Sequence, residues 1–241
     1  MTEPFSPEAV AAYRARMRPQ TVLLMAGGPQ RRWHGAEPRH LAPLGTGTVI
    51  GRTLRQLAQN GVDDPVVVSA APLPGLEGTA AQPCSGPYPA ALAGTRPLWR
   101  GAVLVLSADT VFSDGALRAI LSTPPAPNHA WGFFGKRGAN SFTGKEWSEI
   151  YALRFHADDG GRLAAALADL AAAAVKRRKL HELYRALAGL SPADRPYLPP
   201  GPLFHDVPDW TDDADSRRDL DNIAACMRQL PGADGLAGEG P

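Results

Sequence analysis

Hydrophobic residues along this chain gather in short continuous runs, separated by polar segments that contain glycine and proline. The clearest runs are residues 21–26 (TVLLMA), 65–70 (PVVVSA) and 102–106 (AVLVL). Short runs of this kind are typical of strands that are buried on both faces, as in a parallel sheet. Less regular strands are predicted at residues 130–135, 149–156 and 203–207.

The segments between the runs have the patterns of helices. Residues 6–18 begin with Ser6, which can cap a helix, and Pro7, which suits a first turn. Asp114 is expected to cap a helix that extends to about residue 121. Further helices are predicted at about residues 48–60, 161–175, 177–189 and 216–229. Because strands alternate with helices, the chain is predicted to be an α/β protein, a Rossmann-like three-layer α/β/α sandwich with a mostly parallel central sheet.

The chain divides into three parts by composition. Residues 1–20 are predicted to be an N-terminal helical extension and residues 21–229 the main domain. Residues 230–241 are rich in glycine and proline, which favours a flexible tail. A chain of 241 residues is long enough for one sizeable core, so a single main domain is expected.

Composition and charge exclude several classes of partner. The formal net charge of +1 provides no basic field, so no nucleic-acid partner is expected. The longest apolar stretch, residues 163–175, is too short to span a bilayer, so no membrane partner is expected either. Cys84 and Cys226 form neither a disulfide framework nor a metal-binding motif, which favours a cytoplasmic location. The sequence leaves a homo-oligomer open.

The first candidate site is the turn after the first predicted strand. Ala26, Gly27 and Gly28 end that strand, and Arg31 and Arg32 follow shortly after. Glycine lets a backbone approach a ligand closely, its N–H groups can bind phosphate oxygens, and arginine offsets phosphate charge. The turn also lies at the carboxyl end of a strand, where parallel sheets bind ligands. The alternative is a tight loop with solvated arginines.

The second candidate site consists of two aspartates far apart in the sequence. Asp109 directly follows the 102–106 run, where a carboxylate points into the ligand crevice and suits Mg²⁺. Asp215 lies in an acidic segment just before the last predicted helix, with Asp213 as a second choice. The alternatives are that Asp109 caps the next turn and that the acidic segment is a solvated helix cap.

These segments resemble, in the same order, the signature of sugar-phosphate nucleotidyltransferases and their relatives, which include molybdenum cofactor guanylyltransferases. The signature has an apolar strand, a glycine-rich turn with arginine, and then a Pro-Lys-x-Leu-x-Pro segment. Its counterparts in this chain are residues 24–28 (LMAGG), residues 38–44 (PRHLAPL), residues 106–112 (LSADTVF) and residues 208–220, in which Ser216 would cap the last helix.

The resemblance implies a GT-A-like fold and Mg²⁺-dependent transfer of a nucleoside monophosphate from an NTP to a phosphorylated small-molecule acceptor, such as a sugar phosphate, with release of pyrophosphate. It assigns Asp109 and Asp215 to the metal. It implies catalytic roles for Arg31, Arg32 and Arg39, and acceptor binding by Lys136 and Glu149. The nucleotide would be bound by Leu24, Ala26, Gly27, Gly28, Arg39 and Ser69.

The chain departs from the signature at two points. Residues 29–33 (PQRRW) replace the second half of the glycine turn, and Arg39 stands in the usual position of the lysine. Arginine keeps the positive charge but not the shape of an ammonium group. A non-catalytic nucleotide-binding relative therefore remains an alternative. A nucleotide-sugar-dependent glycosyltransferase is a further one, although Ser107 stands where such enzymes usually have the first aspartate of an Asp-x-Asp pair.

Overall fold

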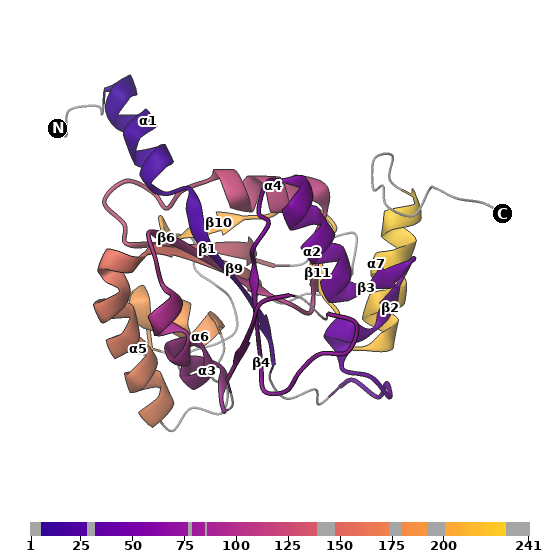
Figure 1. Cartoon of the computed structure of the whole chain (residues 1–241). Coiled ribbons are helices and arrows are strands. Elements are labelled where there is room, and N and C mark those ends of the chain that lie inside the picture. Colours follow the sequence, from indigo (N-terminus) through magenta and orange to yellow (C-terminus); the bar gives the residue numbers. More distant parts are fainter. Residues whose placement is uncertain are drawn as a thin grey trace.

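The computed structural model describes residues 6–27, 32–76, 79–84, 86–138, 148–173, 180–191 and 201–229. A seven-stranded sheet lies at the centre of the molecule (Figure 1). Every neighbouring pair in it is parallel except the two pairs that β9 makes with β6 and β8. In spatial order the strands are β10 (Phe204–Asp206), β8 (Trp131–Lys136), β9 (Glu149–His156), β6 (Ala102–Ser107), β1 (Pro19–Ala26), β4 (Val66–Ser69) and β5 (Ala81–Pro83).

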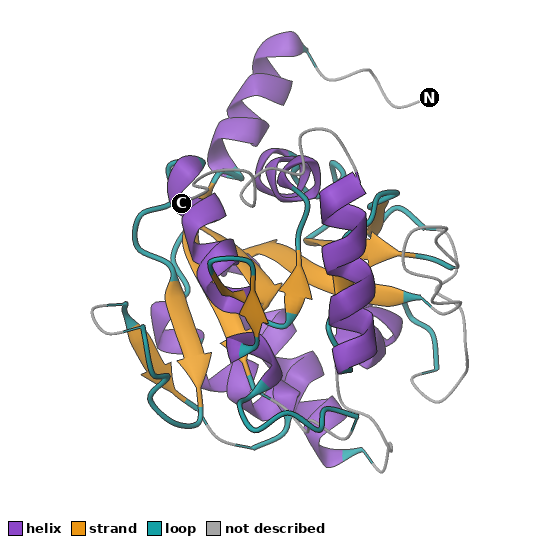
Figure 2. Ribbon diagram, turned by 90° about the vertical axis from the view of Figure 1, so that its right-hand side faces the viewer, coloured by secondary structure: helices purple, strands orange, loops and turns teal. Residues whose placement is uncertain are grey.

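Helices cover both faces of the sheet (Figures 1 and 2). On one face Leu23 and Met25 of β1 pack with α3 (Tyr88–Gly94), α5 (Gly160–Ala172) and α6 (Leu180–Leu187). On the other face Val22 and Leu24 pack with α2 (Val49–Gln59) and α4 (Asp114–Ser122). Successive strand residues thus enter different cores, because side chains alternate across a strand. The predicted α/β/α sandwich with a mostly parallel sheet is confirmed.

A third, smaller core lies beside this sandwich. It joins α7 (Arg217–Gln229) to a hairpin of β2 (Pro43–Leu44) and β3 (Gly47–Thr48). Trp33 and Trp210 are its largest members. A two-stranded antiparallel pair, β7 (Thr110–Val111) with β11 (Asp212–Asp213), connects it to the main sheet. This core packs the 38–44 segment against the acidic C-terminal segment.

The N-terminal helix α1 (Pro7–Arg16) projects from the body of the protein (Figures 1 and 2). As predicted, Ser6 caps it, with its hydroxyl accepting a hydrogen bond from the N–H of Ala9 at 3.2 Å. None of its residues is buried, and the Tyr13 hydroxyl and Arg16 connect it to the domain through Pro125 and Asp158. The division of the chain at residue 20 remains a prediction.

The predicted strands and the main helices are confirmed, with differences at several places. Ser113, not Asp114, caps α4, since its hydroxyl accepts from the N–H of Ala116 at 2.8 Å. The predicted 230–241 tail and residues 174–179 lie outside the described residues. The pattern of apolar residues did not indicate α3, β2, β3, β5, β7, β11 or three short 3₁₀ helices: η1 (Arg39–Leu41), η2 (Arg96–Leu98) and η3 (Ala157–Asp159).

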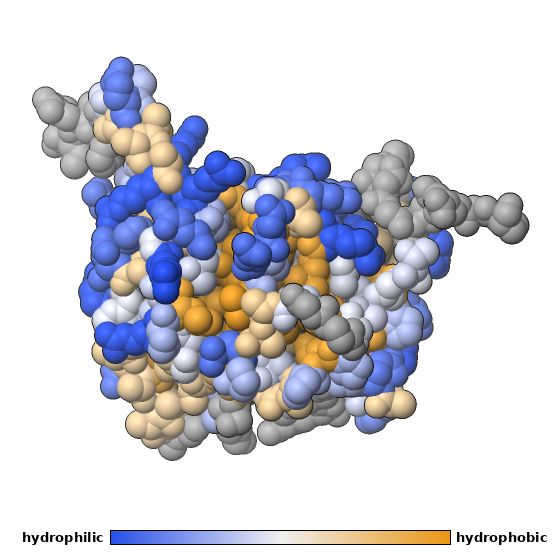
Figure 3. Space-filling model, viewed as in Figure 1, coloured by the Kyte–Doolittle hydropathy of each residue, from blue (hydrophilic) through white to orange (hydrophobic). Residues whose placement is uncertain are grey.

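The surface in Figure 3 carries polar side chains around an apolar area at the middle of that face, in the region where Figure 1 labels β4. The surface around the position of the β4 label is thus less polar than the surfaces beside it. None of the described helices is long and apolar enough to cross a membrane.

Candidate active site

Two neighbouring parallel strands carry the candidate site at their carboxyl ends. β1 and β6 run in register, with Met25 opposite Ser107. One residue later the N–H of Ala108 donates to the carbonyl oxygen of Met25 at 3.2 Å. Asp109 therefore emerges at the same sheet edge as Gly27. This edge, outside the carboxyl ends of parallel strands, is where open α/β sheets bind ligands.

Arg39 lies at the centre of this edge. Its side chain is buried, with 8% of its surface exposed. Its Nη2 pairs with Asp109 Oδ2, and its Nη1 pairs with Asp215 Oδ1. Arg32, which is exposed, pairs with the other oxygen of Asp215. The structure thus brings together two carboxylates that are far apart in the sequence, with one guanidinium between them.

Backbone pairing carries Asp215 to this position. β11 pairs antiparallel with β7, which directly follows Asp109, and the N–H of Ala214 donates to the carbonyl oxygen of Asp109 at 2.9 Å. Ser216 then caps α7, with its hydroxyl accepting from the N–H of Asp219 at 3.2 Å. Asp215 is therefore the residue of the acidic segment that faces Asp109 across the guanidinium.

The segment that contains Arg39 is held in place from the other side. The indole N–H of Trp33 donates to the carbonyl oxygen of Glu37 at 2.7 Å. The guanidinium of Arg217, from α7, lies 4.8 Å from the centre of the Trp33 ring and pairs with the Glu37 carboxylate. These contacts join the 33–41 segment to the same helix that follows Asp215.

The donor set at this edge suits a magnesium ion that also has phosphate ligands. Asp109 and Asp215 both lie within contact distance of one guanidinium, so their carboxylates can face one ion. No group of three or more acidic, histidine or cysteine residues that could hold a metal occurs in the described part of the chain. Mg²⁺ commonly takes one or two carboxylates and completes its shell with water and substrate phosphates. The two aspartates therefore fit this ion.

Comparisons with known proteins show the family and the fold of this chain. The family model of the MobA-like NTP transferase domain matches residues 22–190, more than half of the chain. The chain belongs to this family. Arg39 and Asp109 lie within the matched residues, and Asp215 lies beyond them.

Among solved structures, a Bacillus anthracis protein assigned as a glucose-1-phosphate thymidylyltransferase, in complex with a sucrose, matches with a TM-score of 0.58. The alignment covers 91% of this chain and 99% of that one at 13% sequence identity, so it shows a shared fold. A search of curated proteins gave no significant match.

In this NTP transferase domain the predicted nucleotide-binding residues lie at different depths. Ala26 and Gly27 lie at the end of β1, and a side chain added at Gly27 would meet no atom within 4 Å. Leu24 lies deeper, fully buried between β4 and β6, and its contact with nucleotide remains a prediction. The Ser69 hydroxyl lies 2.5 Å from the carbonyl oxygen of Ala71 and accepts from its N–H at 3.2 Å, which closes a local turn. Gly28 and Arg31 lie outside the described residues.

Lys136, predicted to bind the acceptor, is buried in an ion pair. Its ammonium lies 2.8 Å from Asp212, which is fully buried. The Tyr151 hydroxyl lies 3.2 Å from the other oxygen of Asp212, and burial, with the Asp212 charge next, raises the pKa of Tyr151. This arrangement favours a positioning role for Lys136 beneath the acidic segment. Glu149 lies opposite Lys136 on β9, and binding of an acceptor by either residue remains a prediction.

Two buried polar groups near Asp109 were not among the predicted site residues. The Nε2 atom of His40 and the hydroxyl of Tyr88 have no hydrogen-bond partner among the described residues. Burial lowers the pKa of His40, against the opposing charge of Asp109, and burial with the Asp109 charge raises the pKa of Tyr88. Buried polar groups are rarely left without partners in native proteins. His40 stood beside Arg39 in the family segment, but nothing in the sequence indicated its burial.

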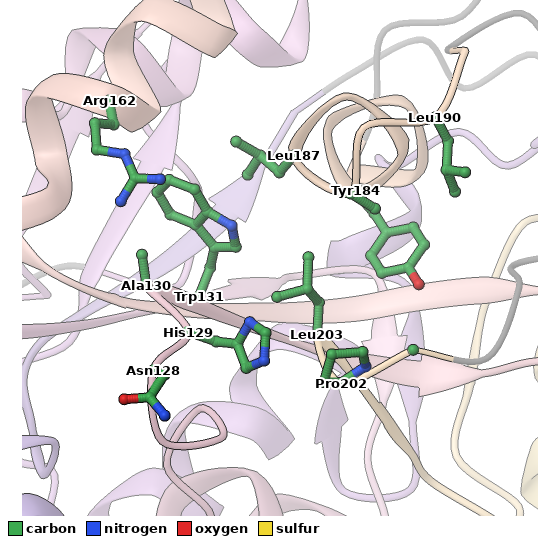
Figure 4. A pocket seen from close by; sticks show the side chains of 12 residues that line it. Asn128, His129, Ala130, Trp131, Arg162, Tyr184, Leu187, Leu190, Pro202 and Leu203 are labelled. Atoms are coloured by element: carbon green, nitrogen blue, oxygen red, sulfur yellow. The ribbon is translucent and has the colours of Figure 1, made fainter. Parts of the chain in front are cut away.

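A separate cavity lies at the opposite end of the sheet (Figure 4). It has a volume of about 520 Å³ and is lined by Trp131, Tyr184 and Leu203, with the Arg162 guanidinium over the Trp131 ring. Trp131 lies level with the start of β6, whereas Asp109 follows the end of β6. None of the described residues that line this cavity carries a carboxylate. We therefore place the candidate active site of this MobA-like domain at the Asp109 edge.

Proposed function

We propose that this MobA-like NTP transferase moves a nucleoside monophosphate from an NTP to a phosphorylated small-molecule acceptor, such as a sugar phosphate, in a Mg²⁺-dependent reaction. The observation that carries the proposal is the convergence of Asp109 and Asp215 on Arg39 beside the glycine turn. Family membership supports the use of an NTP. The similar fold of a protein assigned as a thymidylyltransferase supports an acceptor of the sugar-phosphate kind.

The reaction proceeds by in-line displacement at phosphorus. A phosphate oxygen of the acceptor attacks the α-phosphorus, the bond to the bridging α–β oxygen breaks, and pyrophosphate leaves with that electron pair. Positioning and charge neutralisation provide most of the catalysis in reactions of this class. Backbone N–H groups at Ala26 and Gly27, with Gly28, Arg31 and Arg32, are proposed to bind the β- and γ-phosphates.

The acidic side chains are proposed to bind the metal, and the basic side chains to neutralise or position charge. Asp109 and Asp215 would hold Mg²⁺, which when bound neutralises charge on the phosphates. Arg39 is proposed to offset charge that develops at the α-phosphate. Lys136 keeps Asp212, and with it the strand that leads to Asp215, in place.

A non-catalytic nucleotide-binding domain is the second candidate. The observation that favours it is that Arg39 neutralises both carboxylates that would bind the metal. A lysine at this position has a single ammonium group and would neutralise them less completely. Such a domain would bind an NTP without releasing pyrophosphate.

Two measurements test the proposal and separate the candidates. CTP, UTP, GTP, ATP and dTTP, each with Mg²⁺, are compared for the rise in unfolding temperature that they produce, and the best is then assayed for pyrophosphate release with acceptor phosphates. Asp109→Asn should abolish release while the protein stays folded. Asp114→Asn is the matched control, because Asp114 lies on the same segment but pairs with Arg52 and Gln56. Equal activity of Asp109→Asn and the wild type would exclude the assigned role.

A further inference from the structure

The guanidinium of Arg39 occupies the position between the two carboxylates assigned to the metal. It pairs with one oxygen of Asp109 and one of Asp215, and Arg32 pairs with the second oxygen of Asp215. Three of the four carboxylate oxygens therefore accept from arginine. Two negative and two positive side-chain charges meet here, so this group of four residues has no net charge at neutral pH.

This arrangement conflicts with simple binding of a free metal ion. A divalent cation attracted to two carboxylates would have to share their oxygens with a guanidinium, and like charges at such short range repel each other. Arg39 cannot leave by losing its proton, because a guanidinium stays protonated in proteins. It can leave only by moving its side chain to another anion.

We propose that Arg39 is a displaceable cation, which holds Asp109 and Asp215 together in the nucleotide-free protein and moves to the triphosphate when nucleotide and metal bind. The inference rests on the proposed function and adds a coupling between its two ligands. The nucleotide supplies the anion that Arg39 needs, and the departure of Arg39 exposes the carboxylates that the metal needs. Each ligand therefore raises the affinity for the other by the same factor.

The position of Arg39 in the fold suits this exchange. It begins η1, a single turn directly preceded by Pro38, and it pairs with Asp109, which lies just beyond the end of β6. Arg32, next to the glycine turn, pairs with the same Asp215 carboxylate as Arg39. The same sheet edge receives the phosphates in the proposed function, so a short side-chain movement exchanges one set of oxygens for another. The backbone of this segment stays anchored through Trp33, Glu37 and Arg217.

The test measures metal binding to the protein without any nucleotide. Mn²⁺ serves as the probe, because the electron paramagnetic resonance signal of free Mn²⁺ reports bound and free ion directly. Wild-type protein should bind Mn²⁺ weakly. Arg39→Met should bind it at least about tenfold more tightly, since even one charge-assisted hydrogen bond is worth about that factor and Arg39 pairs with both carboxylates. Arg39→Lys should lie between the two, because an ammonium cannot pair with both carboxylates as a planar fork can.

Two further variants make the result specific. Arg52→Met removes an arginine that is equally buried but pairs with Asp114, and its Mn²⁺ affinity should equal that of the wild type. The double variant Arg39→Met with Asp109→Asn should lose the gain. Circular dichroism and thermal unfolding show whether Arg39→Met folds. If it does not, the Mn²⁺ affinity of Arg39→Lys is compared with that of the wild type and should be higher.

The outcomes separate this inference from the proposed function. Tighter binding in Arg39→Met that depends on Asp109 supports the displaceable cation. Equal Mn²⁺ affinity in the wild type, Arg39→Met and Arg39→Lys overturns it, while Asp109-dependent pyrophosphate release would still support the proposed function. Absence of an Asp109-dependent Mn²⁺ site in every variant, together with absence of pyrophosphate release, overturns both.

Discussion

The backbone N–H of Ala214 donates a hydrogen bond of 2.9 Å to the carbonyl oxygen of Asp109. This bond continues the antiparallel pairing of β7 with β11, in which Val111 lies opposite Asp212 and Thr110 opposite Asp213. It joins Asp109 itself, just beyond the end of β6, to the residue before Asp215. The backbone beside Asp215 is therefore held next to that of Asp109 by strand pairing. Pre-organisation of this kind is what a shared ion or a bridging guanidinium requires.

Substitution of Asp215 tests which residue of the acidic segment belongs to the site. Asp215→Asn removes the charge that faces Asp109 and should lower kcat/KM for the NTP by about a hundredfold or more, since even residues that only support a metal ligand cost about 10–100-fold. Asp213→Asn, on the opposite side of Ala214, is the matched control and should cost less. A larger loss in Asp213→Asn would place the metal ligand there instead.

Two glycine-to-alanine substitutions separate a ligand contact from a packing requirement. Gly27→Ala adds a methyl group where no atom lies within 4 Å, so the free energy of unfolding should change by no more than about 0.5 kcal/mol. The affinity for nucleotide should fall, because the new methyl group would stand where we propose that the phosphates approach the backbone.

Gly135→Ala should have the opposite result. Its added methyl group would overlap the carbonyl oxygen of Glu149 at the irregular point in the pairing of β8 with β9. The free energy of unfolding should fall by about 1–3 kcal/mol or more. Urea unfolding and nucleotide titration of both variants check the pair, and unchanged nucleotide affinity in Gly27→Ala would exclude close approach of the phosphates.

Lys136→Met tests whether the buried lysine positions the acidic segment. It would leave the fully buried Asp212 carboxylate without its ammonium partner, so the free energy of unfolding should fall by about 3–5 kcal/mol. Adding Asp212→Asn should recover part of that loss. If the role is positioning, the KM for the acceptor phosphate should change little in the folded fraction while kcat falls. A raised KM with normal stability would instead support direct contact with the acceptor.

The stability of the protein should decrease as pH falls from 7.5 to 5. His205 stacks on Phe134 at 4.8 Å between ring centres, and burial, with the Arg154 charge second, lowers its pKa. A histidine with a lowered pKa in the folded state contributes stability that is fully present above its unfolded value of about 6.5 and is lost as pH falls toward the folded value.

Substitution of His205 checks this assignment. Denaturant unfolding across the range should show a smaller pH dependence in His205→Gln than in the wild type. His34→Gln serves as the control for loss of a histidine, because the His34 side chain is exposed. An unaltered slope in His205→Gln would assign the effect to other groups, of which His40 is the next candidate.

The sequence by itself determined the layered fold and the location of the site edge. Runs such as residues 102–106 must be buried on both faces, and strands separated by helices pair in parallel, so their carboxyl ends meet at one edge. This reasoning from the apolar runs predicted that Asp109 lies beside the glycine turn. Asp215 came from resemblance to the family segment, because an acidic stretch before a helix is equally typical of a solvated cap.

Only the tertiary structure decided how the site is assembled. The two-residue strands β7 and β11 are too short to leave a periodic pattern, yet their pairing brings Asp215 to Asp109. The burial of Lys136 against Asp212 and the insertion of Arg39 between two carboxylates depend on partners distant in the chain. The local sequence determines which residues can be buried. Which side chain neutralises a buried charge depends on how distant elements pack together.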